Sequence, residues 1–211
     1  MTRPVASTAQ AGFAYQREDF AQLIEDVLKQ AKALGATQSG AEVSEGCGLS
    51  VSVRKGEVEH VERNRDKALG VSVYVGQRRG NASTSDFSPQ AIRDTVQAAF
   101  DIARYTAEDP AAGLPDPDDL ASRKQAGRDL DLYYPWDITA EDALEVARRC
   151  EAAALVVDRR ITNSEGAGVS AQASHFYMGN SLGFRGGYAS SRHSLSVAPI
   201  AGRGNDMQRD A

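Results

Sequence analysis

The fold is decided by residues 49–62, whose sequence is LSVSVRKGEVEHVE. The apolar residues at positions 49, 51 and 53 alternate with polar ones, which is the period of a strand with one buried face. Lys55-Gly56 then supplies a tight turn, and Glu57–Glu62 continues as a more polar strand. Because the connection is short, the two strands are expected to pair antiparallel. The stretch therefore predicts a hairpin within an antiparallel meander.

Further strands and two helices are predicted on either side of this hairpin. Residues 71–75 alternate in the same way, and a weaker strand is predicted through 81–85. Apolar residues recur every three or four positions across 18–34 and again across 88–106, where Ser88 can cap the helix. Each helix has one apolar stripe, so both are predicted to pack on one face of the sheet. The predicted fold class is α+β, with helices packed on an antiparallel or mixed sheet.

The composition changes after this first part of the chain. Residues 108–127 are rich in Pro, Asp, Ala and Gly, which predicts an irregular connection. Thr139 resembles the first residue of a capping box and opens a predicted helix that runs through Val157. Strand-like runs follow at 169–178 and 193–200. No element then closes this β-rich region, so we expect the sequence to be interrupted within a domain.

These patterns divide the chain into four predicted segments. They are a disordered tail over 1–16, an N-terminal α+β domain over 17–107, a Pro/Asp-rich connection over 108–135, and the start of a second, incomplete α+β region over 136–211.

The composition narrows the class of protein. The 211 residues are 41% hydrophobic and 25% charged, as in ordinary globular proteins, and no apolar stretch is long enough to cross a membrane. The N-terminus lacks the apolar core of a secretory signal, and the two cysteines match no redox or metal spacing, so a cytoplasmic location is expected. The net charge of −5 makes nucleic acid an unlikely partner.

The three histidines do not form a recognisable metal motif. A zinc site needs three or four ligands held at helical or hairpin spacing, and no such spacing occurs among His60, His175, His193, Cys47 and Cys150. His175 and His193 could meet across neighbouring strands, with Cys47 as a third ligand, but ordinary polar or half-buried histidines are the favoured interpretation. No metal-binding residue is predicted.

Other candidate motifs are equally weak. Ser191 shares a strand face with His193, but a catalytic triad needs a third group that orients the base. Residues 183–187, GFRGG, lack the ending of a phosphate loop and are interpreted as a bulge or a tight strand connection. Glu57 and Glu59 are interpreted as exposed charge. The residues therefore predict no catalytic and no cofactor-binding site.

Several segments resemble the PmbA/TldD family of metallopeptidases, in particular its PmbA (TldE) type. They occur in order along the chain: SVRKGEVE (52–59), ALGVSVY (68–74), GNASTSD (80–86), SPQAI (88–92), DIARYT (101–106), RITNSEG (160–166), GNSLGF (179–184) and SRHSLS (191–196). The match extends from about the first helix to the C-terminus, so the chain is identified as the N-terminal part of a member of this family.

The resemblance implies properties that composition cannot supply. Family members are roughly twice this long, which would suit a second large domain. TldD-type members carry a His-Glu-x-x-x-His zinc motif in that later region, whereas PmbA-type members lack it, and the two types associate into a heterodimer. The family is linked to maturation of peptide antibiotics, to degradation of unfolded peptides and, under an older name, to modulation of DNA gyrase.

Three hypotheses about function follow. The leading one is a non-catalytic portion of a metallopeptidase assembly that acts on flexible peptides, with zinc on a TldD-type partner. On this hypothesis the later region of the chain associates either with such a partner or with a second copy, as a homodimer. The alternative is a regulatory binding protein that modulates DNA gyrase without proteolysis. A third is a free-standing hydrolase built on His193 and nearby serines. On the leading hypothesis, the 211-residue chain alone binds no zinc and cleaves no peptide.

Overall fold

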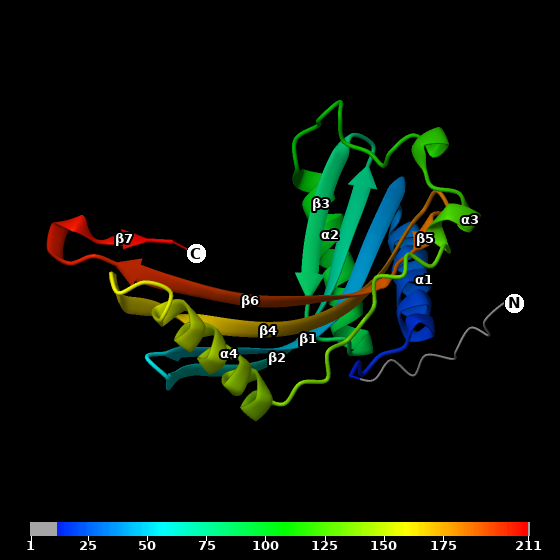
Figure 1. The fold of residues 1–211 in the computed structure, drawn as a ribbon. Coiled ribbons are helices and arrows are strands. Elements are labelled where there is room, and N and C mark those ends of the chain that lie inside the picture. Colours follow the sequence, from blue (N-terminus) through cyan, green and yellow to red (C-terminus); the bar gives the residue numbers. More distant parts are fainter. Residues whose placement is uncertain (1–11, 211) are drawn as a thin grey trace, which may run out of the picture. The chain divides into compact units, whose positions relative to one another are not determined.

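The computed structural model describes residues 12–210 and shows an α+β fold (Figure 1). The helices are α1 (Arg17–Leu34), α2 (Pro89–Tyr105), α3 (Arg123–Ala126) and α4 (Ala140–Leu155), with 3-10 turns at Pro117–Asp119 and Gly204–Asp206. The strands are β1 (Gln38–Arg54), β2 (Glu57–Val75), β3 (Arg78–Thr84), β4 (Ile161–Asn180), β5 (Arg185–Gly186), β6 (Ala189–Ala201) and β7 (Gln208–Arg209). The predicted fold class is confirmed.

The strands form one sheet in the order β3-β2-β1-β4-β6-β7, with β5 paired to β4. β2 and β3 are antiparallel, with Val73 opposite Gly80. The prediction of separate strands at 57–62 and 71–75 is wrong, because β2 continues through the polar residues between them. A strand interior depends on backbone pairing with its neighbours, so a polar stretch does not end it. The later strands join the same sheet beside β1.

The chain divides into two compact units, each built from three separate segments. The first contains residues up to Gly46, Asp66–Asp131 and Ser174–Ala189, and the second contains Cys47–Arg65, Leu132–Ala173 and the residues from Ser190 onward. The units therefore alternate along the chain, whereas the predicted division at 108–135 was sequential. The reason is that β1, β2 and β4 are long enough to contribute residues to both units.

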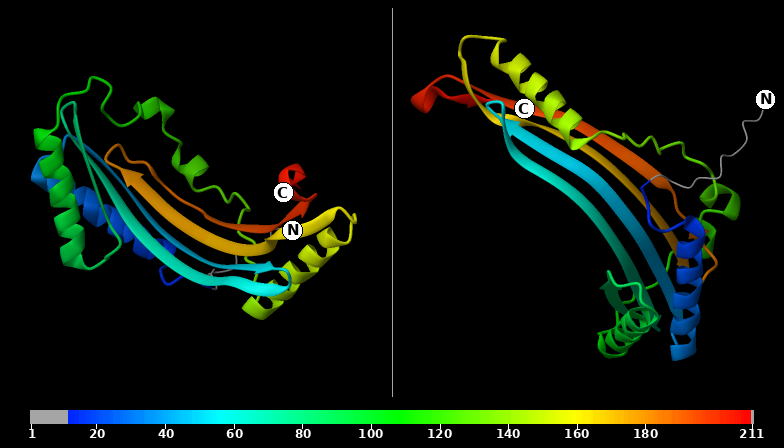
Figure 2. Two further views of the ribbon diagram at one scale, coloured as in Figure 1. Left: turned by 90° about the vertical axis from the view of Figure 1, so that its left-hand side faces the viewer. Right: turned by 90° about the horizontal axis from the view of Figure 1, so that it is seen from below.

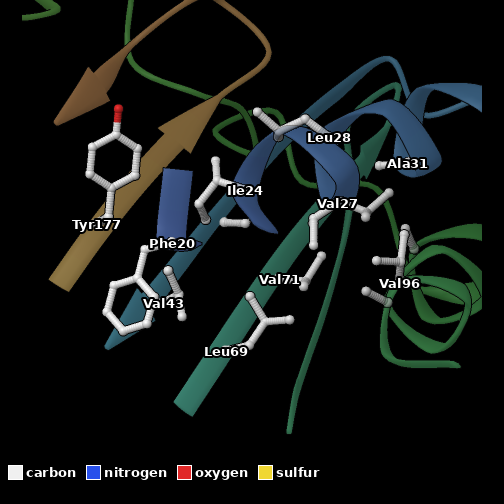
Figure 3. Close-up of a cluster of buried hydrophobic side chains, with 14 residues drawn as sticks. Phe20, Ile24, Val27, Leu28, Ala31, Val43, Leu69, Val71, Val96 and Tyr177 are labelled. Atoms are coloured by element: carbon white, nitrogen blue, oxygen red, sulfur yellow. The ribbon is translucent and has the colours of Figure 1, made fainter. Parts of the chain in front are cut away.

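The two long helices of the first unit pack on one face of its strands, as predicted (Figure 1, Figure 2). Their apolar stripes and the strand residues that point toward them form a single core (Figure 3). Its largest fully buried members are Phe20, Ile24, Val27, Val43, Leu69, Val71, Val73 and Val96. Gly80 lets β3 approach α2 closely, since a Cβ there would lie 2.0 Å from the carbonyl oxygen of Ala99.

The helix ends follow local sequence signals. The Ser88 hydroxyl accepts a hydrogen bond from the backbone amide of Ala91 at 3.3 Å, and the Thr139 hydroxyl accepts one from Asp142 at 3.1 Å. Both predicted caps are confirmed. Helix α4 ends at Leu155, two residues before the predicted end. Within the predicted connection, the turn at Pro117–Asp119 and the short helix α3 are regular elements that the proline content did not indicate.

The core of the second unit is small and built on alanine. Helix α4 places Ala143 and Ala147 against β1 and β4. The other buried members are Leu49, Val51, Val53, Ala167 and Val169. The short alanine side chains let the helix lie close to the sheet. None of the helices in the described part of the chain combines the length and apolarity needed to cross a membrane.

The predicted tail of 1–16 falls mostly on residues 1–11, which lie outside the described residues. Residues 12–16 pack against the first unit. Phe13 is buried, and the backbone amides of Ala14 and Tyr15 donate hydrogen bonds to the Glu45 carboxylate at 2.9 to 3.1 Å. The buried Glu45 carboxylate is the partner that holds this segment, and the sequence pattern did not indicate it.

Candidate functional site

A cavity of about 680 Å³ lies in the first unit. Along each strand, the residues that form its floor alternate with the residues of the core. Because successive side chains of a strand point to opposite faces, the cavity lies on the sheet face opposite α1 and α2. The floor residues are Gly40 and Glu42 from β1, Gly70 and Ser72 from β2, Asn81 and Ser83 from β3, and Met178 and Asn180 from β4. Leu114, Pro115, Leu120 and Ala121 of the proline-rich connection form its cover.

The cavity exists because glycines replace side chains on its floor. A Cβ atom at Gly70 would have the carbonyl oxygen of Glu42, at 4.0 Å, as its nearest neighbour, so a side chain there would extend into open space. A Cβ at Gly40 would meet the Leu114 side chain only at 3.7 Å. Neither glycine has the positive φ that would exclude other residues. The small residues therefore leave volume on this face.

Hydrogen bonds hold the cover in place. The backbone amide of Leu114 donates to the Gln38 side-chain oxygen at 2.8 Å, at the start of β1. The amide of Asp109 donates to the carbonyl of Gln77 at 2.8 Å, in the turn between β2 and β3. The connection is thus tied to the sheet at two points, and it encloses the cavity instead of hanging free.

The turn after β4 forms another wall. Asn180 accepts hydrogen bonds on its side-chain oxygen from the amides of Leu182 and Phe184, at 3.0 and 3.1 Å. Gly183 has a φ of +96°, which favours glycine. Of the two interpretations of 183–187, the structure shows the tight strand connection and not the bulge. Arg185 donates to Glu25 of α1 at 2.6 Å, and this hydrogen bond lowers the pKa of Glu25.

The residues that line the cavity are of the kinds found in binding sites. Its apolar walls carry a few polar groups, among them Ser72, which donates to Asn81 at 2.7 Å. Mostly apolar walls with isolated polar groups are typical of ligand pockets. The described residues that line it include no histidine or cysteine, and its acidic groups are those of Glu42 and Asp119. The cavity can therefore hold an apolar group.

His175 lies in a buried pair with Glu45, apart from the cavity lining. Its Nε2 is 3.4 Å from the Glu45 carboxylate, and its ring lies 4.2 Å from the Phe13 ring and 4.5 Å from the Phe20 ring. Burial lowers the pKa of His175 and Glu45 raises it, with a net result below the ordinary value of 6.5. This pair anchors the chain before α1, which is a structural role.

The titration of His175 predicts a pH dependence of stability. The unfolded chain takes up a proton on this residue more readily than the folded one, so the free energy of unfolding should fall as the pH is lowered from about 7 through 6.5 and below. His175→Phe keeps a ring between Phe13 and Phe20 but cannot take up a proton, so it should remove this part of the pH dependence of the free energy of unfolding. Urea unfolding across pH is the measurement, with the exposed His60→Phe as control. Identical pH profiles for wild type and His175→Phe would contradict it.

His193 lies in the second unit with different partners. Its Nε2 is 2.8 Å from the Tyr134 carbonyl, and its ring packs edge-on to Trp136 at 5.6 Å. The Ser191 hydroxyl accepts from the Tyr134 amide at 2.8 Å, and the Ser194 hydroxyl bonds to Ser170 at 2.8 Å. These contacts tie residues 132–136 to β6, and the serines bond to groups other than the imidazole.

The remaining candidates are dispersed. His60 lies beside Glu62 at 3.2 Å on an exposed strand, and Cys47 and Cys150 are half-buried free thiols. Glu57 and Glu59 are exposed, as interpreted. His175 and His193 have separate partners in different units, so the suggested convergence is not seen. Over residues 12–210 no three of the His, Cys, Asp and Glu side chains are grouped to hold a metal ion.

Two buried carboxylates were missed by sequence reasoning. Glu45 follows the buried positions 41 and 43 of β1, and Glu151 follows Ala143 and Ala147 at helical spacing on α4. A charged residue on a buried stripe signals a paired group, because an unpaired buried charge is very costly. That signal was present in the sequence, but it does not indicate which residues pair with the two carboxylates.

Models of two consecutive family domains match most of the chain. Residues 41–103 match domain 1 of the PmbA/TldA metallopeptidases, and residues 133–211 match their central domain. This chain belongs to the PmbA/TldD family. The segments quoted above as resembling the family lie mainly within these matches, so the resemblance is confirmed.

Curated relatives of this PmbA/TldD chain carry the name metalloprotease PmbA. The Escherichia coli O157:H7 protein of that name is 49% identical over 191 residues, which are 89% of this chain and 42% of the relative. The Haemophilus influenzae homologue is 43% identical over 195 residues, 92% of this chain and 42% of the relative. The chain thus spans about two fifths of the length of these relatives.

Solved structures share the PmbA/TldD fold. A proposed modulator of DNA gyrase from Bacteroides thetaiotaomicron has a TM-score of 0.79 at 23% identity, covering 92% of this chain and 43% of that one. TldE from Thermococcus kodakarensis has a TM-score of 0.69 at 12% identity, covering 88% of this chain and 40% of that one. At these identities the likeness concerns the fold alone.

Proposed function

We propose that this chain is the N-terminal portion of a PmbA/TldE-type subunit of a cytoplasmic metallopeptidase assembly that processes or degrades flexible peptides. The observation that carries the proposal is the apolar cavity of about 680 Å³, whose volume suits apolar side chains of an unfolded segment. Family membership and the name metalloprotease PmbA of the curated relatives support the reaction class. In this proposal the chain binds peptide and does not cut it.

The described residues supply no ligand set for zinc, so the proposal assigns the catalytic metal to a TldD-type partner. Zinc there would activate the water that attacks the peptide bond. The contribution of this chain is to hold the peptide: the cavity takes an apolar side chain, and Asn81 and Ser83 at its floor can hydrogen-bond main-chain groups. Maturation of peptide antibiotics is one outcome that such an assembly could serve.

The assembly is tested by co-expressing the full-length protein with a TldD-type partner. The purified complex should cleave an unstructured peptide, and a zinc chelator should abolish cleavage. Cleavage that is absent, or unaffected by chelator, would overturn the peptidase proposal and favour the alternative, a non-enzymatic regulatory protein that modulates DNA gyrase.

The cavity is tested by Gly70→Val in the same full-length complex. The valine side chain would fill space on the cavity floor, so we expect kcat/KM for an apolar peptide to fall about tenfold or more. Valine suits a strand, so the melting temperature should not fall. Ser52→Val adds a similar side chain to β1 outside the cavity and should leave cleavage unchanged. Equal activity of the Gly70→Val and Ser52→Val complexes would exclude the cavity as the peptide site.

A further inference from the structure

Another cavity of the first unit, of about 420 Å³, is bordered by three cationic side chains. Lys29 and Lys32 are neighbours on one face of α1, and Arg185 comes from β5, which lies beside that helix in Figure 1. The described residues that line this cavity include no Asp or Glu, and they share only Asn180 with the larger cavity. We call it the basic pocket. Its positive lining contrasts with the net charge of −5 of the chain.

Two of the positive charges at the basic pocket are not neutralised by the fold. Arg185 pairs with Glu25 at 2.6 Å, and this hydrogen bond is the largest cause of the lowered pKa of Glu25. The charge of Lys29 also lowers that pKa, but neither Lys29 nor Lys32 forms a hydrogen bond or an ion pair with a described residue. Three cations against one carboxylate therefore leave two positive charges beside the pocket.

A buried hydroxyl also faces the basic pocket. Ser39, at the start of β1, is 2% exposed, and its Oγ forms no hydrogen bond with the described residues. Every fully enclosed side-chain oxygen of the described residues has a partner, so the Ser39 hydroxyl is open to the pocket that it lines. The Ser181 hydroxyl accepts from the Ser39 amide at 3.0 Å, which leaves its own proton available. A buried polar group without a partner is unfavourable, so this arrangement favours a ligand that accepts hydrogen bonds.

The end of α1 beside the pocket does not oppose an anion strongly. The last carbonyls of a helix carry partial negative charge. Here the amides of Gly35 and Ala36 donate to the carbonyls of Lys32 and Ala31, each at 3.1 Å. The positive φ of Gly35 allows this closure, and Lys32 places a cation in the last turn. The negative end of the helix is therefore capped and partly neutralised.

We propose that the basic pocket binds the phosphoryl group of a small organic phosphate. A phosphate monoester carries about 1.5 to 2 negative charges at neutral pH and three strong acceptor oxygens. These match the two remaining positive charges and the donors of Lys29, Lys32 and Ser39. A carboxylate carries a single charge and would leave one of the lysines without a counter-charge. The proposal concerns a separate site and is independent of peptide cleavage.

The rest of the basic pocket suits the organic part of such a ligand. Its volume of about 420 Å³ falls within the usual range for small-molecule sites and exceeds what a bare anion needs. Leu28, Ala36 and Leu182 supply apolar surface beside the cations. The amides of Leu182 and Phe184 are already bound to Asn180, so side chains, and not the backbone of a phosphate loop, would hold the anion.

Titration calorimetry of the full-length protein with phenyl phosphate tests the charges. Lys29→Gln/Lys32→Gln should weaken binding about a hundredfold, since each lysine contributes a hydrogen bond between charged groups. Arg149→Gln/Arg159→Gln removes two exposed positive charges from the second unit and should leave the affinity unchanged. Equal weakening by the two double variants would show that phenyl phosphate responds only to the overall charge, and would overturn the proposal.

Ser39→Ala tests the pocket itself without changing a charge. The Ser39 hydroxyl has no partner among the described residues, so its removal should not lower the melting temperature. If it donates to the phosphoryl group, the affinity for phenyl phosphate should fall about tenfold. Lys29 and Lys32 are exposed, so the lysine variant should also fold as wild type does. An unchanged affinity of Ser39→Ala would contradict binding in the basic pocket.

Two further ligands test the chemical class. Benzoate has the same ring with a carboxylate of single charge, and inorganic phosphate has the anion without the ring. Phenyl phosphate should bind more tightly than either one. Benzoate that binds as tightly would exclude recognition of a phosphoryl group, and inorganic phosphate that binds as tightly would exclude an organic ligand. Absence of phenyl phosphate binding by wild type would overturn the proposal as a whole.

Discussion

Replacing Glu45 with alanine is expected to lower the free energy of unfolding by about 3–5 kcal/mol, the typical cost of breaking a buried charged pair. Glu45 is 2% exposed and accepts hydrogen bonds from the amides of Ala14 and Tyr15, besides contacting His175. The substitution leaves these groups without their acceptor and opens a cavity. It should also free residues 12–16, which are held to β1 through this carboxylate. Urea unfolding measures the first effect and hydrogen exchange the second.

A neighbouring glutamate provides the control for this prediction. Glu42 lies on the same strand with an exposed side chain, so Glu42→Ala should change stability by no more than about 0.5 kcal/mol. Glu45→Gln keeps the size of the side chain and one acceptor, so its loss of stability should lie between those of Glu45→Ala and Glu42→Ala. If Glu45→Ala costs no more than Glu42→Ala, the carboxylate does not anchor the segment.

Replacing Glu151 with alanine is expected to cost about 2–3 kcal/mol, in the range for hydrogen bonds to a charged group. Glu151 is 1% exposed and accepts from the amides of Lys55 and Gly56 at 2.9 and 2.8 Å, so it holds the β1–β2 turn against α4. Arg148 donates to the carbonyl of Gly56 at 3.0 Å from the same helix. Thermal and urea unfolding should both show the loss, and Glu145→Ala, at an exposed position of α4, should not.

The pH dependence of the free energy of unfolding offers a second measurement of how much Glu151 contributes to stability. Burial raises its pKa, but hydrogen bonds from Gly56, Lys55 and Ser164 and the charge of Arg54 together outweigh burial, so the pKa lies below its ordinary value of 4.5. The folded chain therefore binds this proton less readily than the unfolded one. The stabilisation is present above about pH 4.5 and is lost as the pH falls further. Wild type and Glu151→Ala should converge in stability on acidification, and a constant difference between them would show that the charge contributes nothing.

Much of the secondary structure could be predicted because its signals are local. The period of residues 49–53 identified a strand with one buried face, and the caps at Ser88 and Thr139 lie within three residues of the amides they bind. The apolar stripes of α1 and α2 required a common partner, and the sheet face provides it. The polar residues 63–67 did not carry such a signal, so the continuity of β2 could not be predicted.

The candidate site depended on contacts between distant parts of the chain. The cavity combines floor residues of four strands with a cover from residues 114–121, and sequence spacing does not bring these together. The glycines on its floor are compatible with a bulge, a turn or a cavity when only the sequence is known. The proline-rich connection was predicted to be irregular, but its position over the sheet depends on hydrogen bonds to Gln38 and Gln77.

The sequence by itself determined the family, the fold class, the main helices and the hairpin, because these depend on segment similarity, periodicity and caps within a few residues. Only the tertiary structure decided that Glu45 meets His175, 130 residues away, and that Glu151 holds the turn at Lys55. Only it showed a cavity on one sheet face. The physical reason is that a buried charge selects its partner through packing and desolvation in the folded chain, and these act across any separation in sequence.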